Sequence, residues 1–182
     1  MPQFVSYNSN IEVNGYTIQS FIKGVTPLFR QKIISILADN DINNLEKDNW
    51  YNQQNWLDAF KQIYETIGEH TLFSIGKSIP DSAIFPDYIK NLKDALASID
   101  IAYHENHRGG EIGYYRLIKY NSKKREAIME CKTPYPDAFN QGIITSIVRK
   151  FKPTNSLGHE VKQGDKASEN IDPELSTYLI RW

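Results

Sequence analysis

The chain has 182 residues, a length that suits one domain with a core large enough to need no disulfide or metal. Lys and Arg total 21 and Asp and Glu total 22, so the net charge is −1. This balance argues against a nucleic-acid binder, which carries a basic surface. The one cysteine, Cys131, excludes an intramolecular disulfide and a multi-cysteine zinc site.

The start of the chain, MPQFVSYNSN, lacks the basic region and apolar run of a signal peptide. No window approaches the roughly 18 apolar residues of a membrane span. The sequence therefore predicts a cytoplasmic protein that does not cross a membrane. Residues 1–14 are polar and predict a loose segment with a short strand near 11–13, and residues 15–182 predict a single domain.

Apolar residues at helical spacing predict helices in the first half of the chain. A short helix is expected over 15–23, and a second starts at Pro27, because proline suits the first helical position. A third is expected over 52–67, where Gly68 breaks it before apolar character resumes. Pro86 predicts the start of a further helix that continues to Ile99.

Strand patterns follow that helix. Residues 114–120 and 125–132 predict a hairpin whose returning strand places Ala127, Met129 and Cys131 on one face. Asp137 is expected to begin a helix that ends at Pro153. Strands at 156–161 and 175–182 then predict a second hairpin around an exposed loop at 162–173. The predicted fold is α+β, with N-terminal helices packed on an antiparallel sheet made of two hairpins separated by a helix.

The densest polar cluster is DIAYHENHRGGEIG, residues 100–113. His104 and His107 are three residues apart, which on a helix places both on one face and suits a metal. A third ligand would come from Glu111, Asp100 or His159. The favoured interpretation is structural, a helix end at the glycines with cationic side chains near the last carbonyls.

Two further features carry candidate chemistry. Arg108 beside Gly109 and Gly110 has the donors to hold a carboxylate or phosphate, although the same glycines also suit a strand bulge. Cys131 lies in a predicted strand, where a buried inert thiol is the favoured interpretation. The alternative is a reactive thiol with His104 or His107 as its base.

The C-terminal sequence HEVKQGDKASENIDPELSTYLIRW and the helix FNQGIITSIVRKF before it resemble the end of 4-vinyl-reductase-type domains. These belong to a superfamily with haem-nitric-oxide-binding domains and core subunits of vesicle-tethering complexes. The resemblance implies a sensor-like fold over roughly residues 15–182. Ser176 stands where a cysteine is expected, so that family's cysteine chemistry does not carry over.

The haem-binding relatives use a helix histidine and a Tyr-x-Ser-x-Arg run. The helix expected over 86–99 has no histidine, and residues 131–136 lack the serine and arginine. The resemblance therefore does not support haem ligation of that kind, and the sequence identifies no cofactor.

These observations predict a non-catalytic small-molecule-binding or sensory module. An apolar pocket between the helices and the sheet would hold an apolar or amphipathic ligand. The candidate ligand-binding residues are His104, His107, Arg108, Tyr114 and Cys131. One alternative is a metal-dependent enzyme that uses His104 and His107. Another is a protein-interaction module without a small ligand, acting as a homodimer or with a signalling partner.

Overall fold

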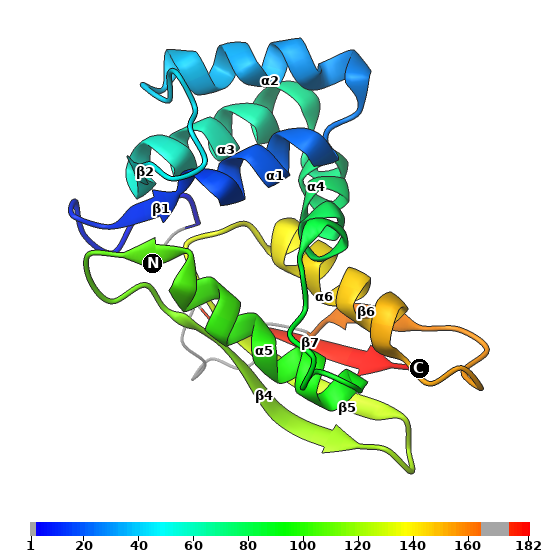
Figure 1. Ribbon diagram of the computed structural model, residues 1–182. Coiled ribbons are helices and arrows are strands. Elements are labelled where there is room, and N and C mark those ends of the chain that lie inside the picture. Colours follow the sequence, from blue (N-terminus) through cyan, green and yellow to red (C-terminus); the bar gives the residue numbers. More distant parts are fainter. Residues whose placement is uncertain (1–2, 165–174) are drawn as a thin grey trace.

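Helices form most of the first part of the chain and strands most of the last part. The computed structural model describes residues 3–164 and 175–182 (Figure 1). In these residues the helices are α1 (Gly15–Gly24), α2 (Pro27–Asp39), α3 (Gln53–Ile67), α4 (Glu69–Ser82), α5 (Leu92–Glu105) and α6 (Asp137–Phe151). The strands are β1 (Glu12–Asn14), β2 (Trp50–Asn52), β3 (His107–Arg108), β4 (Tyr114–Asn121), β5 (Glu126–Lys132), β6 (Glu160–Gln163) and β7 (Ser176–Arg181). None of these helices is long and apolar enough to cross a membrane.

Asparagine side chains fix where several helices begin. Asn14, Asn52 and Asn91 each accept a hydrogen bond from a backbone N–H in the first turn of α1, α3 and α5. Such a cap satisfies an N–H group that has no partner inside the helix. The predicted helix start at Pro86 is wrong, because Pro86 lies in a turn whose carbonyl accepts from Ile89. α5 begins after Asn91 and runs past its predicted end.

The larger sheet is antiparallel, with strand order β4-β5-β7-β6. The predicted α+β fold with two hairpins separated by a helix is confirmed. Ala127, Met129 and Cys131 are buried on one face of β5, as the alternation predicts, and Tyr178 and Ile180 of β7 share that buried layer. The predicted loop over 162–173 begins too early, because residues 162 and 163 belong to β6, and residues 165–173 lie outside the described part of the chain.

A smaller sheet of order β2-β1-β3 joins three distant parts of the chain. Val13 in β1 pairs with Tyr51 in β2 and with His107 in β3. Ile11 and Val13 are fully buried. Strands of two or three residues are too short to show an alternating pattern, so the sequence predicted only the one near residues 11–13. The domain boundary expected at residue 15 stays a prediction.

The chain forms two lobes, the helical lobe of α1–α4 and the sheet lobe of α5, α6 and the larger sheet (Figure 1). α4 and α6 cross where the two lobes meet, and their backbones are in direct contact there. A Cβ atom on Gly142 would lie 2.3 Å from the carbonyl oxygen of Phe73, and one on Gly76 would lie 2.2 Å from that of Phe139. Only glycine permits this approach of two backbones.

One aromatic ring belongs to both lobes. Phe60 of α3 packs against Trp56 at 4.7 Å and Phe21 at 4.9 Å within the helical lobe. It also packs against Phe139 at 5.0 Å and Tyr135 at 5.4 Å in the sheet lobe. These edge-on and tilted geometries are favourable for aromatic pairs, so Phe60 links the two parts of the core.

Candidate functional site

A cavity of about 130 Å³ lies between the two lobes. Its apolar wall comes from α4 and α6 and is made of Ile79, Pro80, Phe139, Ile143 and Ile147. Its opposite, aromatic wall combines residues from α3, α5, β3, β4 and the turn before α6, and is made of Trp56, Tyr103, His107, Tyr115 and Tyr135.

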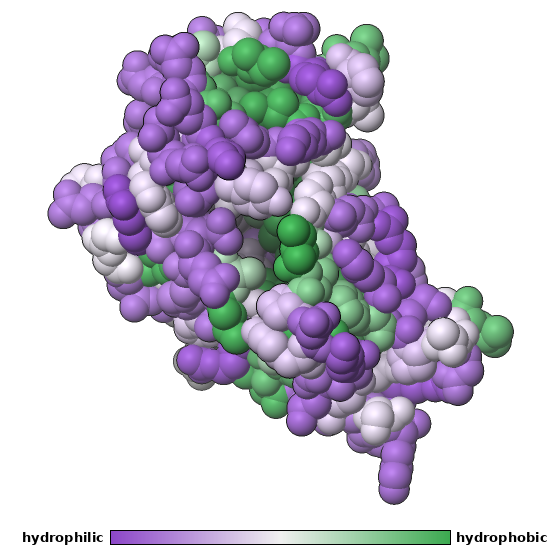
Figure 2. Space-filling model, in the orientation of Figure 1, coloured by the Kyte–Doolittle hydropathy of each residue, from purple (hydrophilic) through white to green (hydrophobic). Residues whose placement is uncertain are grey.

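The mouth of the cavity lies where α1 meets α5 and the end of α4. Its lining residues Thr17, Ala83, Ala102 and Asn106 keep contact with solvent, whereas most residues of the two walls are buried. Figure 2 shows the surface hollowed between α1 and α5, with hydrophobic residues at its edge. The hydroxyl of Thr17 donates to the side-chain oxygen of Asn106 at 3.0 Å across this mouth.

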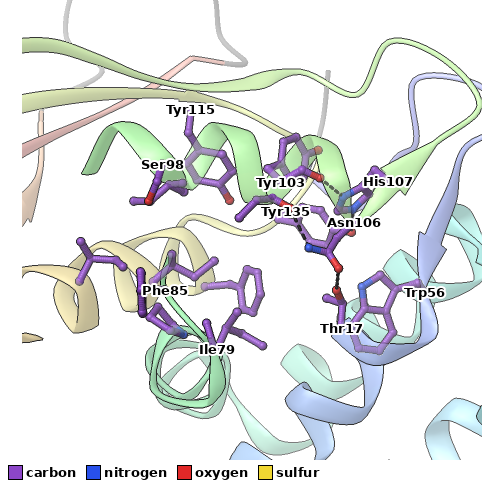
Figure 3. Close-up of a pocket in the computed structure, with 17 residues that line it drawn as sticks. Thr17, Trp56, Ile79, Phe85, Ser98, Tyr103, Asn106, His107, Tyr115 and Tyr135 are labelled. Carbon is purple, nitrogen blue, oxygen red and sulfur yellow. Dashed lines mark hydrogen bonds between the residues drawn. The ribbon is translucent and has the colours of Figure 1, made fainter. Parts of the chain in front are cut away.

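The aromatic wall holds a buried histidine–tyrosine pair (Figure 3). The Nδ1 atom of His107 lies 2.8 Å from the carbonyl oxygen of Tyr103, and its Nε2 atom lies 2.7 Å from the hydroxyl of Tyr135. A carbonyl only accepts, so Nδ1 carries the proton. Burial lowers the pKa of His107 to about 4, partly offset by the bond to the Tyr103 carbonyl. At neutral pH the ring is therefore neutral, and the Tyr135 hydroxyl donates to Nε2.

The two other phenols of this wall also have protein partners. Tyr103 donates to the carbonyl of Ile112 at 2.5 Å, and Tyr115 donates to the side-chain oxygen of Asn140 at 2.5 Å. Burial raises the pKa of both phenols well above the ordinary value, so both stay protonated. The wall is thus neutral at physiological pH.

A buried amide lies behind this wall. Gln53 is fully buried, and its side-chain oxygen accepts from the hydroxyl of Ser6 at 2.7 Å. Its side-chain nitrogen has no hydrogen-bond partner among the described residues. Burial raises the pKa of Tyr135, and the nearby side chains of Gln53 and Trp56 lower it in part. A buried, unsatisfied donor is costly and marks a site with spare hydrogen-bonding capacity.

The structure separates the two predicted histidines. α5 ends at Glu105, so His107 lies in β3 and shares no helical face with His104. His104 is exposed, and its Nδ1 contacts the carbonyl of Asp100 at 2.9 Å. In the described residues no three His, Cys, Asp or Glu side chains gather as a metal site. A metal role for the two histidines stays a prediction.

The remaining candidate residues lie away from the cavity. Arg108 is exposed, pairs with Glu12 at 2.6 Å and stacks over Trp50 at 4.3 Å. Tyr114 lies beneath the guanidinium of Arg116. Cys131 is buried on the inner face of β5, where burial raises the pKa of its thiol well above the ordinary value.

Sequence reasoning missed Tyr103, Tyr115 and Tyr135 as cavity residues. Tyr115 lies in the strand predicted over 114–120, and Tyr135 lies between two prolines, so neither local pattern indicates a cavity residue. The available signal was the generous tyrosine content, 11 residues, but content alone does not show which rings converge.

No family model matches the chain, and no curated protein matches it. Solved structures do match. An H-NOX protein from S. oneidensis in the Fe(II)NO state is 6% identical, with a TM-score of 0.64 over 92% of this chain and 98% of the other. An oxygen-binding H-NOX domain related to soluble guanylate cyclases is 16% identical, with a TM-score of 0.62 over 92% of this chain and 94% of the other.

A variant of Cs H-NOX is 15% identical, with a TM-score of 0.65 over 92% of this chain and 94% of the other. The chain has the fold of H-NOX domains. The resemblance to haem-nitric-oxide-binding domains noted in the sequence is therefore confirmed at the level of the fold. At these identities the H-NOX fold alone is shared, and activity must be argued from the residues of this chain.

Proposed function

We propose that this chain is a non-catalytic binding module that takes up a small apolar molecule in the cavity between its two lobes, as a sensory domain does. The observation that carries the proposal is the cavity itself, which has an apolar wall opposite a few convergent polar groups. This combination is typical of small-molecule sites.

The volume limits the size of the ligand. A cavity of about 130 Å³ is close to an engineered cavity of roughly 150 Å³ that stays dry and binds benzene or xenon. Pockets for drug-sized ligands occupy about 300–1,000 Å³. The cavity therefore suits a molecule about as large as one aromatic ring.

Haem is the group that this fold implies, since haem distortion was studied in H-NOX proteins with similar structures. The residues present do not fit it. The cavity is less than half the size of a drug-sized pocket, and the rings of Tyr103, Tyr115 and Tyr135 occupy its wall. α5 contributes Ser98, Ile99 and Ala102 to the lining but no histidine. The ring nitrogens of His107 are both paired within the protein.

Binding of benzene and xenon tests the proposal. We expect benzene to shift the resonances of cavity methyl groups in NMR spectra and to raise the melting temperature in proportion to occupancy. The variant Ile143→Phe adds ring atoms to the cavity and should abolish both effects. The matched control Ile101→Phe changes an exposed residue of α5 outside the cavity and should bind as the unmodified protein does.

If benzene and xenon leave the spectra of the unmodified protein unchanged, the cavity is not a binding site and the proposal fails. Haemin provides a second test. We expect no Soret band typical of an axial histidine when haemin is added. A band that disappears in His107→Ala would show that haem binds.

The other hypotheses stay predictions. A metal-dependent activity through His104 and His107 has no third ligand gathered in the described residues. Association as a homodimer or with a signalling protein is compatible with exposed apolar side chains such as Leu28 and Phe29 of α2. We favour ligand binding because the cavity combines space with placed polar groups.

A further inference from the structure

Building on the proposed function, we infer that the cavity selects neutral molecules that carry a hydrogen-bond donor, because the hydroxyl groups around it give their protons to the protein and offer only lone pairs to a guest. The cavity would thus select its ligand by polarity as well as by size.

The hydroxyl groups of the aromatic wall show this polarity most clearly. Tyr135 donates to Nε2 of His107, Tyr103 to the carbonyl of Ile112, and Tyr115 to Asn140. A phenol has one proton to donate and two lone pairs to accept with. With that proton committed, each of the three hydroxyl groups can act toward a guest only as an acceptor.

Polar groups at the mouth and on the α5 side of the cavity also donate their protons to the protein. Thr17 donates to the side-chain oxygen of Asn106, and the amide nitrogen of Asn106 donates to the carbonyl of Ala102. The hydroxyl of Ser98 donates to the carbonyl of Ala95. The hydroxyls of Thr17 and Ser98 therefore resemble the three phenols, since each gives its proton to the protein and can only accept from a guest.

Two side chains near the aromatic wall also carry N–H donors. The side chains of Trp56 and Gln53 lower the pKa of Tyr135 against the raising effect of burial, so both lie close to its phenol, which is an acceptor within the protein. Figure 3 shows the labelled polar groups of Tyr103, Asn106, His107 and Tyr135 gathered on the α5 side of the cavity, opposite Ile79 and Phe85.

Charge excludes another class of ligand. The lining contains no Lys, Arg, Asp or Glu among the described residues, and its histidine is neutral with Nδ1 committed. An ion that entered would lose its hydration without meeting a counter-charge, which costs far more than one hydrogen bond returns. The cavity therefore disfavours carboxylates and ammonium groups.

A pair of rings with nearly the same shape tests the inference. Pyrrole has an N–H donor, whereas furan has none. We expect pyrrole to bind the unmodified protein about tenfold more tightly than furan in NMR titrations, because only pyrrole forms a hydrogen bond to the acceptors. Benzonitrile, which only accepts, should bind more weakly than toluene.

The variant His107→Leu should change this preference. It removes the acceptor of the Tyr135 proton, which is then free to donate to a guest. We expect benzonitrile to gain about fivefold or more in affinity, and the pyrrole preference to shrink to about threefold or less. The exposed variant His104→Leu is the control and should keep the original preference.

The outcomes are distinct. Equal binding of pyrrole and furan would overturn the inference and leave the proposed function standing, whereas no binding of benzene, xenon or either ring would overturn the proposed function. If His107→Leu does not fold, the pyrrole-to-furan ratio of the unmodified protein still decides the inference.

Discussion

The two walls of the cavity are built in different ways. The apolar wall stands on α4 and α6, which Gly76 and Gly142 bring into backbone contact. The aromatic wall comes from the end of α5, from β3 and β4, and from the turn before α6, and it is held by hydrogen bonds of 2.5–2.8 Å. The apolar wall borders the open volume of the cavity, and the aromatic wall carries the polar groups that would orient a ligand. Changes to each should therefore have different signatures.

The largest effect is expected at Phe60, which supports both walls. Phe60→Ala removes the ring contacts to Trp56, Tyr135 and Phe139 and leaves a cavity, at a cost of about 3–5 kcal/mol in the free energy of unfolding. Urea denaturation measures this loss. The partly exposed Phe29 is the control, and Phe29→Ala should cost about 0.5 kcal/mol. Equal losses would show that Phe60 does not link the walls.

Acid should weaken the aromatic wall in particular. His107 is buried and neutral, with its pKa lowered from 6.5 to about 4 by burial and, to a smaller extent, by the neighbouring His104. The unfolded chain binds a proton between these two values and the folded chain does not. Stability is therefore retained above pH 6.5 and lost as the pH falls toward 4, by roughly 2–3 kcal/mol at pH 4.5.

Urea denaturation at pH 7 and pH 4.5 measures this dependence. In His107→Leu the difference between the two pH values should shrink by most of that amount. Parallel losses in both proteins would assign the acid sensitivity to other groups, such as Asp81, whose pKa is lowered by its bonds to Arg149 and Ser146 against the raising effect of burial.

A single hydroxyl tests the histidine–tyrosine pair. Tyr135→Phe keeps the ring and its packing but leaves Nε2 of His107 without its donor, which should cost about 1–2 kcal/mol. Tyr88→Phe, at an exposed position, should change stability little. A neutral effect of Tyr135→Phe would mean that the buried bond contributes nothing.

The smallest effect is expected at the mouth. Thr17→Val preserves shape and removes the hydrogen bond to Asn106, at a cost of about 0.5–1 kcal/mol. A double-mutant cycle with Asn106→Ala isolates this interaction. Additive losses would show that the two residues are not coupled across the opening.

Periodicity predicted the elements of the apolar wall but not the contacts of the aromatic wall. The apolar residues of α6 and the buried face of β5 follow directly from helical and strand spacing. The position of His107 depends on where α5 ends, and the prediction ended that helix at Ile99. The pairing of His107 with Tyr135 joins segments 28 residues apart, and no local pattern contains that information.

The sequence predicted a pocket between the helices and the sheet, and a cavity with His107 in its lining lies there. That this cavity binds a ligand stays a prediction. The exposed Arg108 and His104 were grouped with His107 because they are its neighbours in sequence, although β3 turns consecutive side chains to opposite sides.

The pairing of β3 with β1 gives His107 a mechanical connection beyond the cavity. His107 in β3 pairs with Val13 in β1, and β1 pairs on its other side with β2. β1 and β2 end at Asn14 and Asn52, the caps at which α1 and α3 begin. A guest that displaced the imidazole would therefore disturb a strand that is bonded to the starting points of both helices.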